Sequence, residues 1–107
     1  MRYYTIESVR QKGINDMEFQ HENGRIALYN EEGTTIAEVT FPPIGDTLVN
    51  LNHTFVDGSL RGQGVAGKLM QEAAAQLRRE HKKAILTCSY AQQWFEKHPE
   101  YDDVVQR

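Results

Sequence analysis

The stretch Arg61-Gly62-Gln63-Gly64-Val65-Ala66-Gly67-Lys68 holds three glycines and two cations, and it stands between a strand-like segment and a strongly helical one. Glycine lets a backbone approach a ligand closely. The N–H groups at a helix start have no partner within the helix, and the helix dipole adds partial positive charge there. The stretch therefore predicts a phosphate-binding turn, and the function depends on which ligand this turn holds.

Three known patterns fit the turn. Gly62, Gly64 and Gly67 spell the dinucleotide pattern G-x-G-x-x-G, and the same stretch stops one residue short of a Walker A loop. The third pattern is Arg-x-x-Gly-x-Ala, formed by Arg61, Gly64 and Ala66.

Two of these patterns fail on chemistry or context. A Walker A loop needs a hydroxyl on the residue after Lys68, where this chain has Leu69, and no apolar strand further on ends in an aspartate. A dinucleotide site needs a carboxylate about twenty residues beyond the turn, within a βαβ unit. That region is Ile85-Leu86-Thr87-Cys88, which has none, and hairpins precede the turn. Arg-x-x-Gly-x-Ala remains.

Bulk composition narrows the class of protein. The chain has 107 residues, 39% of them hydrophobic, and a net charge of −3, as expected for one globular domain over 1–107. A sequence-independent nucleic-acid binder would need a basic surface, so we expect no nucleic-acid partner. A single cysteine fits a reducing compartment. We see no signal peptide and no apolar run long enough to cross a membrane, so we expect a cytoplasmic protein.

The first half of the chain alternates like a β-sheet, after a weakly patterned segment 1–14 that we leave unassigned. Asn23-Gly24 is a strong hairpin signal, and Pro42-Pro43 interrupts the alternation. In the last strand Val49, Leu51, His53 and Phe55 are expected on one face. The predicted strands form an antiparallel meander over 17–21, 25–29, 34–41 and 47–56.

The second half predicts one β-α-β crossover and a second helix. Apolar residues recur at helical spacing from Val65 onward, which predicts a long helix over 63–81. A short apolar strand over 84–88 follows, parallel to the strand 47–56, and a shorter helix over 90–97 ends before Pro99. The expected fold class is α+β, a mixed sheet with one long and one short helix.

This order of elements around an Arg-x-x-Gly-x-Ala turn resembles the GNAT superfamily of N-acetyltransferases, and is most similar to its very small single-domain members. His53-Thr54-Phe55-Val56 before the turn, and Cys88 followed by His98-Pro99-Glu100-Tyr101 after it, match that small subgroup. The resemblance covers about residues 15–105 and makes the whole chain a minimal acyl-CoA N-acyltransferase-like domain.

The resemblance implies acetyl-CoA as the co-substrate and no metal. In the family, backbone amides of the turn hold the CoA pyrophosphate, and the pantetheine arm pairs with the strand before the turn. That pairing would use Phe55 and Val56, because parallel strands that separate leave backbone groups for the pantetheine amides. A strand N–H would face the thioester oxygen. The pyrophosphate would lie on Arg61, Gly62, Gln63, Gly64, Val65 and Ala66, with Gly67 adding close approach and Lys68 adding charge.

The chain departs from the larger family members at the proton donor. They carry an Asn, an Ala three positions later and a Tyr four further on, and the Tyr is thought to reprotonate the CoA thiolate. The corresponding positions here are Cys88, Ala91 and Phe95, and phenylalanine has no exchangeable proton. The N-terminal helices that usually build the acceptor pocket are also missing.

Two residues are candidates for catalysis. Cys88 could deliver a proton or accept the acetyl group, although free cysteine is commonly a small buried hydrophobe. His53 could take the proton of the amine, or be a hydrogen-bonded core histidine. Tyr90, Trp94 and Phe95 form an aromatic stripe at helical spacing, better explained by packing than by a ligand groove.

The expected function is therefore an acetyl-CoA-dependent N-acetyltransferase. Its amine acceptor would be a small molecule, a protein lysine or an N-terminus, and a homodimer is an open option. The alternative is a CoA or acetyl-CoA binding module without catalysis, and a nucleotide-binding domain is a more distant one.

Overall fold

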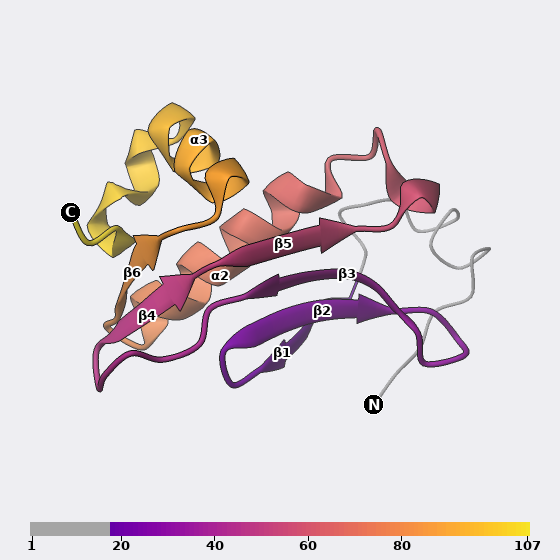
Figure 1. The fold of residues 1–107 in the computed structure, drawn as a ribbon, viewed down its shortest axis with the longest axis horizontal. Coiled ribbons are helices and arrows are strands. Elements are labelled where there is room, and N and C mark those ends of the chain that lie inside the picture. Colours follow the sequence, from indigo (N-terminus) through magenta and orange to yellow (C-terminus); the bar gives the residue numbers. More distant parts are fainter. Residues whose placement is uncertain (1–17) are drawn as a thin grey trace.

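The computed structural model describes residues 18–107, so the unassigned segment 1–14 lies outside the described residues. Figure 1 shows the sheet in front, helix α2 behind it, and helix α3 with the C-terminal turn beyond one end of the sheet. In chain order the elements are β1 (Gln20–Glu22), β2 (Arg25–Tyr29), β3 (Thr35–Thr40), β4 (Leu48–Leu51), β5 (His53–Val56), the 3₁₀ turn η2 (Gly58–Leu60), α2 (Val65–Arg79), β6 (Lys83–Leu86), α3 (Ser89–Lys97) and the 3₁₀ helix η3 (Pro99–Val104).

The predicted antiparallel meander is confirmed. Four strands pair in the order β1-β2-β3-β5, each antiparallel to the next. Asn23-Gly24 makes the first turn as expected, and Gly24 has the positive φ of +74° that such a turn requires. Residue 17 of the predicted strand 17–21 lies outside the described residues, and among those described the strand starts later than expected, because β1 pairs with β2 from Gln20 to Glu22.

The predicted strand 47–56 is broken at Asn52 into β4 and β5. Strand β4 pairs in parallel with β6, whereas β5 pairs with β3. The extra residue inverts the side-chain alternation: Leu51 is fully buried, while His53 and Phe55 are exposed. The expectation that Val49, Leu51, His53 and Phe55 share one face is therefore wrong, because an irregular residue shifts the period of two by one position.

The predicted crossover is confirmed, with a shorter helix than expected. Helix α2 begins at Val65, after Gly64 in the left-handed region, and ends at Arg79. At its end Lys82 N donates to Leu77 O at 2.9 Å and His81 has a φ of +56°, which is the geometry of a Schellman motif. The helix buries one face against the sheet, through Val65, Leu69, Met70, Ala73, Ala74 and Leu77.

The C-terminal third of the chain packs beside α2 and adds its buried side chains to the hydrophobic core. Strand β6 spans Lys83–Leu86 in place of the predicted 84–88, since the amides of Thr87 and Cys88 both donate to Leu51 O at 3.1 Å and end the parallel ladder. Helix α3 is confirmed with an earlier start, and η3, which was not predicted, follows Pro99. Arg78 of α2 holds η3 in place with two hydrogen bonds to Asp103, at 2.8 and 2.6 Å.

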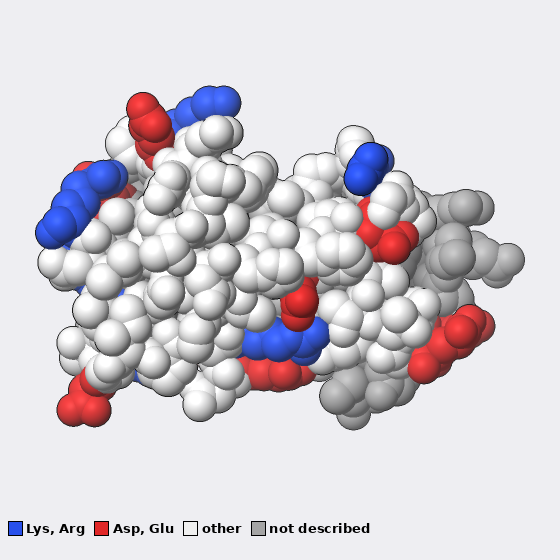
Figure 2. All heavy atoms as spheres, viewed as in Figure 1, with Lys and Arg blue, Asp and Glu red and all other residues white. Residues whose placement is uncertain are grey.

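The other face of the sheet is not covered by a helix among residues 18–107. Figure 2 views this face and shows few charged atoms except at the rim and in one mixed group over the middle of the sheet. Glu38 on β3 accepts from Arg25 on β2 at 2.7 Å, in this part of the sheet. Within the described part of the chain, no helix is long and apolar enough to span a membrane.

Candidate functional site

The turn before α2 presents open backbone amides. Gly62 and Gly64 have φ values of +82° and +71°, which glycine adopts without strain. Gly64 is the N-cap residue of α2, and no side chain caps the helix. Among residues 18–107, the amides from Gly64 to Gly67 have no hydrogen-bond partner, and Lys68 is the first to bond back, to Gly64 O at 3.1 Å. The helix start therefore offers several donors to one ligand.

The segment just before this turn is stabilised by its own contacts. Asp57 accepts from Ser59 N at 2.9 Å and from Ser59 Oγ at 2.6 Å. These two hydrogen bonds lower the pKa of Asp57. The carboxylate is therefore held at η2 and does not cap α2, while Arg61 to Gly64 stay exposed.

Strands β5 and β6 separate beside the turn. The parallel ladder ends with the Leu51–Leu86 pair, and β5 continues only along β3. Asp57 N donates to Ile36 O at 2.8 Å, so by the alternation of an antiparallel pair Phe55 also bonds toward β3. The backbone groups of Thr54 and Val56 therefore face the open edge. This geometry favours Thr54 and Val56 for pairing with a ligand, whereas the sequence suggested Phe55 and Val56.

Cys88 lies at the end of this open edge. It is half-buried and immediately precedes α3, and its Sγ lies 3.6 Å from Thr54 Oγ1 on β5. The structure therefore places the thiol on the α2 side of β5, where the helix start also lies. Of the proposed catalytic residues, Cys88 alone is on this side.

His53 lies on the opposite face of β5. Its Nε2 is 3.3 Å from Glu38 Oε2, and Arg25 holds the other oxygen of that carboxylate at 2.7 Å. The imidazole is 51% exposed, so it is not a core histidine. Because His53 and Thr54 alternate across the strand, His53 and the Cys88 thiol are not brought together on one face.

Two aromatic residues of α3, Trp94 and Tyr90, lie beside the start of α2. A Cβ on Gly67 would lie 3.4 Å from Trp94 Nε1 and 3.9 Å from Tyr90 Oη. Burial, followed by the electrostatic influence of Cys88, raises the pKa of Tyr90. The sequence showed these residues only as an aromatic stripe. Their nearness to Gly67 is the missed signal, since a glycine inside a helix often marks a close approach.

Phe95 lies in the core, where it offers no exchangeable proton to the helix start. Its side chain is 1% exposed and meets Trp94 edge to face, with 5.0 Å between ring centroids. His98 is also structural, because its Nδ1 lies 2.7 Å from Trp94 O at the end of α3.

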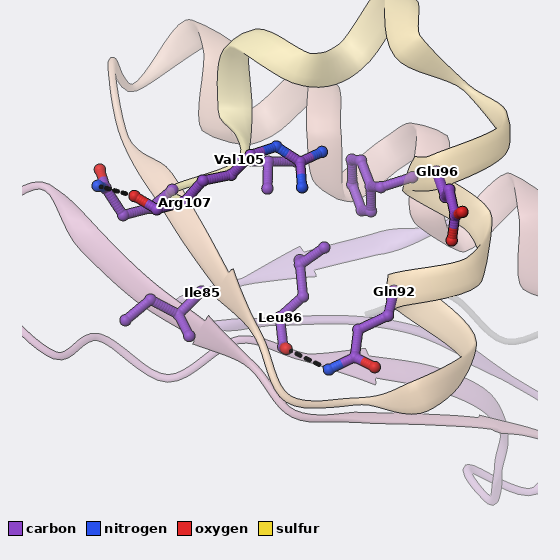
Figure 3. A pocket seen from close by; sticks show the side chains of 8 residues that line it. Ile85, Leu86, Gln92, Glu96, Val105 and Arg107 are labelled. Carbon is purple, nitrogen blue, oxygen red and sulfur yellow. Dashed lines mark hydrogen bonds between the residues drawn. The ribbon is translucent and has the colours of Figure 1, made fainter.

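A separate groove opens beside β6 and the C-terminal residues (Figure 3). It measures about 580 Å³, and one of its lining side chains, Gln92, donates to Leu86 O at 2.8 Å. None of the residues of the glycine turn lines it, nor does Cys88. Within residues 18–107 no cluster of three or more His, Cys, Asp or Glu side chains could hold a metal ion. The lining residues are Ile85, Leu86, Gln92, Phe95, Glu96, Val105, Gln106 and Arg107.

An uncapped helix start beside two separating strands is the arrangement that the resemblance to the GNAT superfamily leads us to expect, and comparison with known proteins agrees. Residues 25–104 match the family described as GCN5-related N-acetyl-transferase. The chain belongs to this family.

Solved structures of similar proteins support the same fold. The solution structure of a GCN5-like candidate N-acetyltransferase from Staphylococcus aureus has a TM-score of 0.70 and 30% sequence identity, covering 84% of this chain and 88% of that one. Ard1 from Thermoplasma volcanium, at 16% identity and a TM-score of 0.54, covers 92% of this chain and 66% of that chain, and shows likeness of fold alone.

Curated relatives match over part of their length. The human and mouse Protein NATD1 are each 35% identical over 63 residues, which is 59% of this chain. The match spans 56% of the human protein and 57% of the mouse protein.

Proposed function

We propose that this protein is an acetyl-CoA-dependent N-acetyltransferase that transfers an acetyl group to an amine. One observation carries the proposal: unpartnered amides at the start of α2 adjoin the open edge of β5, and the Cys88 thiol lies at the end of that edge. A diphosphate fits the amides, and an extended chain of amide groups fits the strand edge. The family membership supports the same assignment.

The co-substrate would lie along α2 and β5. The amides of Gly62, Gly64, Val65 and Ala66 would hold the diphosphate, whereas the Gln63 amide already donates to Leu60 O at 3.4 Å. Arg61 and Lys68 would add positive charge. The backbone of Thr54 and Val56 would pair with the pantetheine arm. This arrangement directs the thioester toward Cys88, where the strands separate.

The reaction needs a base for the amine and an acid for the sulfur. The amine nitrogen forms a bond to the acetyl carbon, the carbon–sulfur bond breaks, and the CoA sulfur takes a proton. Tyr90 is a hydroxyl that could supply that proton, because its Oη lies beside the first turn of α2, 3.9 Å from the position that a Cβ on Gly67 would take. His53, oriented by Glu38, would accept the proton of an amine that reaches the gap between β5 and β6 from the face of β5 opposite Cys88.

Cys88 offers a second route through an acetyl-enzyme. Its thiolate would attack the thioester and release the CoA thiolate, and the amine would then attack the new thioester and restore the cysteine. Mass spectrometry after incubation with acetyl-CoA alone distinguishes the routes, because only the second adds one acetyl group to the protein, at Cys88.

Calorimetric titration with acetyl-CoA tests binding, and release of free thiol in the presence of an amine panel tests turnover. Small amines, lysine-containing peptides and peptide N-termini belong in that panel. Tighter binding of ATP or NAD than of acetyl-CoA would contradict the proposal.

A CoA or acetyl-CoA binding module without catalysis is the second candidate, and the buried Phe95 favours it. At this position the side chain supplies no proton and does not reach the site. Binding of acetyl-CoA without thiol release above the Cys88→Ala background, across the whole panel, would establish the module. A homodimer and a cytoplasmic location remain predictions, which light scattering and cell fractionation test.

A further inference from the structure

The indole ring of Trp94 is fixed on both sides. The imidazole of His98 stacks on it with ring centroids 3.9 Å apart and planes 13° apart, and Tyr101 lies at 5.5 Å. Only 8% of Trp94 is exposed. The orientation of its N–H group is therefore set by packing and not by solvent.

The N–H edge of this ring points at the first turn of α2. Trp94 Nε1 lies 3.4 Å from the position that a Cβ of Gly67 would take. The missing side chain of Gly67 leaves room for the ring edge beside the helix. Any larger residue at position 67 would meet this nitrogen.

The indole N–H has no acceptor among residues 18–107. Tryptophan N–H groups in largely buried rings usually find a hydrogen-bond partner. No side-chain nitrogen or oxygen in the described part of the chain is both sealed from solvent and unpartnered, so a ligand atom can reach this nitrogen. The acceptor it lacks can come from outside the chain.

The groups around Trp94 Nε1 are also donors. The open amides of the helix start lie on one side, and the hydroxyl of Tyr90, one turn earlier on α3, lies 3.9 Å from the same Cβ position. A space bordered by N–H and O–H groups accepts a ligand that presents oxygen acceptors.

We propose that the Trp94 N–H donates a hydrogen bond to an oxygen of bound acetyl-CoA, which makes α3 the second wall of the co-substrate site. This inference rests on the proposed function, since it takes the same ligand. The acceptor is an oxygen of the diphosphate or of a pantetheine amide.

Trp94 is the single tryptophan of the chain, so its indole gives one signal in a nitrogen–proton NMR spectrum. On titration with CoA we expect this signal to move downfield and to exchange more slowly with solvent. Calorimetry on Trp94→Phe, which keeps an aromatic ring but removes the N–H, should show CoA binding weakened by about 2- to 10-fold. Tyr90→Phe is the matched control on the same helix face, and it should leave the indole shift in place.

Two fragments identify the acceptor. If it is a phosphate oxygen, Trp94→Phe weakens ADP binding; if it is a pantetheine oxygen, the variant weakens pantetheine binding and leaves ADP unaffected. The NMR titration of the wild-type protein still tests the hydrogen bond of the Trp94 N–H if Trp94→Phe fails to fold.

The remaining outcomes contradict either the Trp94 inference alone or the proposed function with it. If wild-type protein binds CoA while the indole signal stays still, the Trp94 inference is wrong and the proposed function stands. If Trp94→Phe binds CoA more weakly but the indole signal of the wild-type protein does not shift on titration, the ring only supports packing. If wild-type protein binds no CoA, both the inference and the proposed function fall.

Discussion

Thr54 Oγ1 lies 3.6 Å from Cys88 Sγ, and this contact joins β5 to the start of α3 across the point where β5 and β6 separate. The two residues are 34 positions apart in sequence. The thiol is therefore fixed at the end of the strand edge that the co-substrate would occupy, and it is half-buried rather than enclosed in the core.

Replacing Cys88 tests its part in the chemistry. Cys88→Ala should lower the rate of acetyl transfer by about 100-fold if the thiol takes the acetyl group, because a nucleophile then disappears. Acetyl-CoA affinity should change little, since the diphosphate would lie at the other end of the proposed site. Thr54→Val is the control, as it removes the hydroxyl and keeps the thiol. Full activity in Cys88→Ala would assign the cysteine to packing.

Gly64→Val tests the helix start. Gly64 has a φ of +71°, so a β-branched residue there costs about 1–2 kcal/mol of folding stability and turns the amides away from the ligand. We expect acetyl-CoA affinity to fall by about 10-fold or more, measured by calorimetry. Gly58→Ala is the matched control, because its Cβ would meet nothing within 4 Å. Equal losses in both variants would indicate a general disturbance of the loop.

His53→Gln tests the base on the uncovered face. The rate of amine acetylation should fall by about 100-fold while acetyl-CoA affinity is unchanged, because the imidazole lies on the face of β5 away from Cys88. Glu38→Gln, which removes the charge that orients His53, should give a smaller loss in the same rate. An unchanged rate in His53→Gln would mean that the proton leaves by another path.

Phe95→Tyr tests whether a tyrosine at this position, where larger family members carry one, can supply the missing proton donor. The side chain is 1% exposed, so a hydroxyl added there would be buried without a designed partner, at a cost of about 1–3 kcal/mol in unfolding free energy. We expect a lower denaturant midpoint and no gain in turnover. A faster enzyme would show that position 95 reaches the thioester.

The contact between Arg78 and Asp103 should make stability depend on pH. The hydrogen bonds from Arg78, followed by the attraction of its charge, lower the pKa of Asp103 below its ordinary 3.8. A carboxylate with a lowered folded pKa stabilises the fold above the ordinary value and loses that effect as pH falls through the folded pKa. Arg78 and Asp103 are about half exposed, at 48% and 52%, so solvent weakens the pair and the expected effect is small. In urea unfolding from pH 7 to 2, the midpoints of wild type and Asp103→Asn should differ slightly at neutral pH and converge as the pH falls below about 4.

Asp102→Asn is the control for this measurement. Asp102 pairs at 2.7 Å with Arg107, and both side chains are more than half exposed, at 55% and 65%. Such a surface pair contributes little to stability. A loss at Asp102 equal to that at Asp103 would contradict a specific role for the α2–η3 contact.

Local patterns predicted the elements because their causes are local. Asn23-Gly24 made its hairpin, and the helical spacing after Val65 made α2. The break at Asn52 was not visible, since β4 and β5 each alternate on their own and the one-residue shift between them follows from their different partners, β6 and β3. The η3 helix was also missed, because its position depends on the long-range contact from Arg78 to Asp103.

The sequence by itself determined the family-type turn and the open start of α2, because glycine conformations and helix periodicity depend on neighbouring residues alone. Only the tertiary structure decided which face His53 takes, which backbone groups of β5 remain unpaired, and where the Trp94 N–H points. These features depend on strand register and on contacts between α2 and α3. Such contacts join residues far apart in the chain, and no local pattern encodes them.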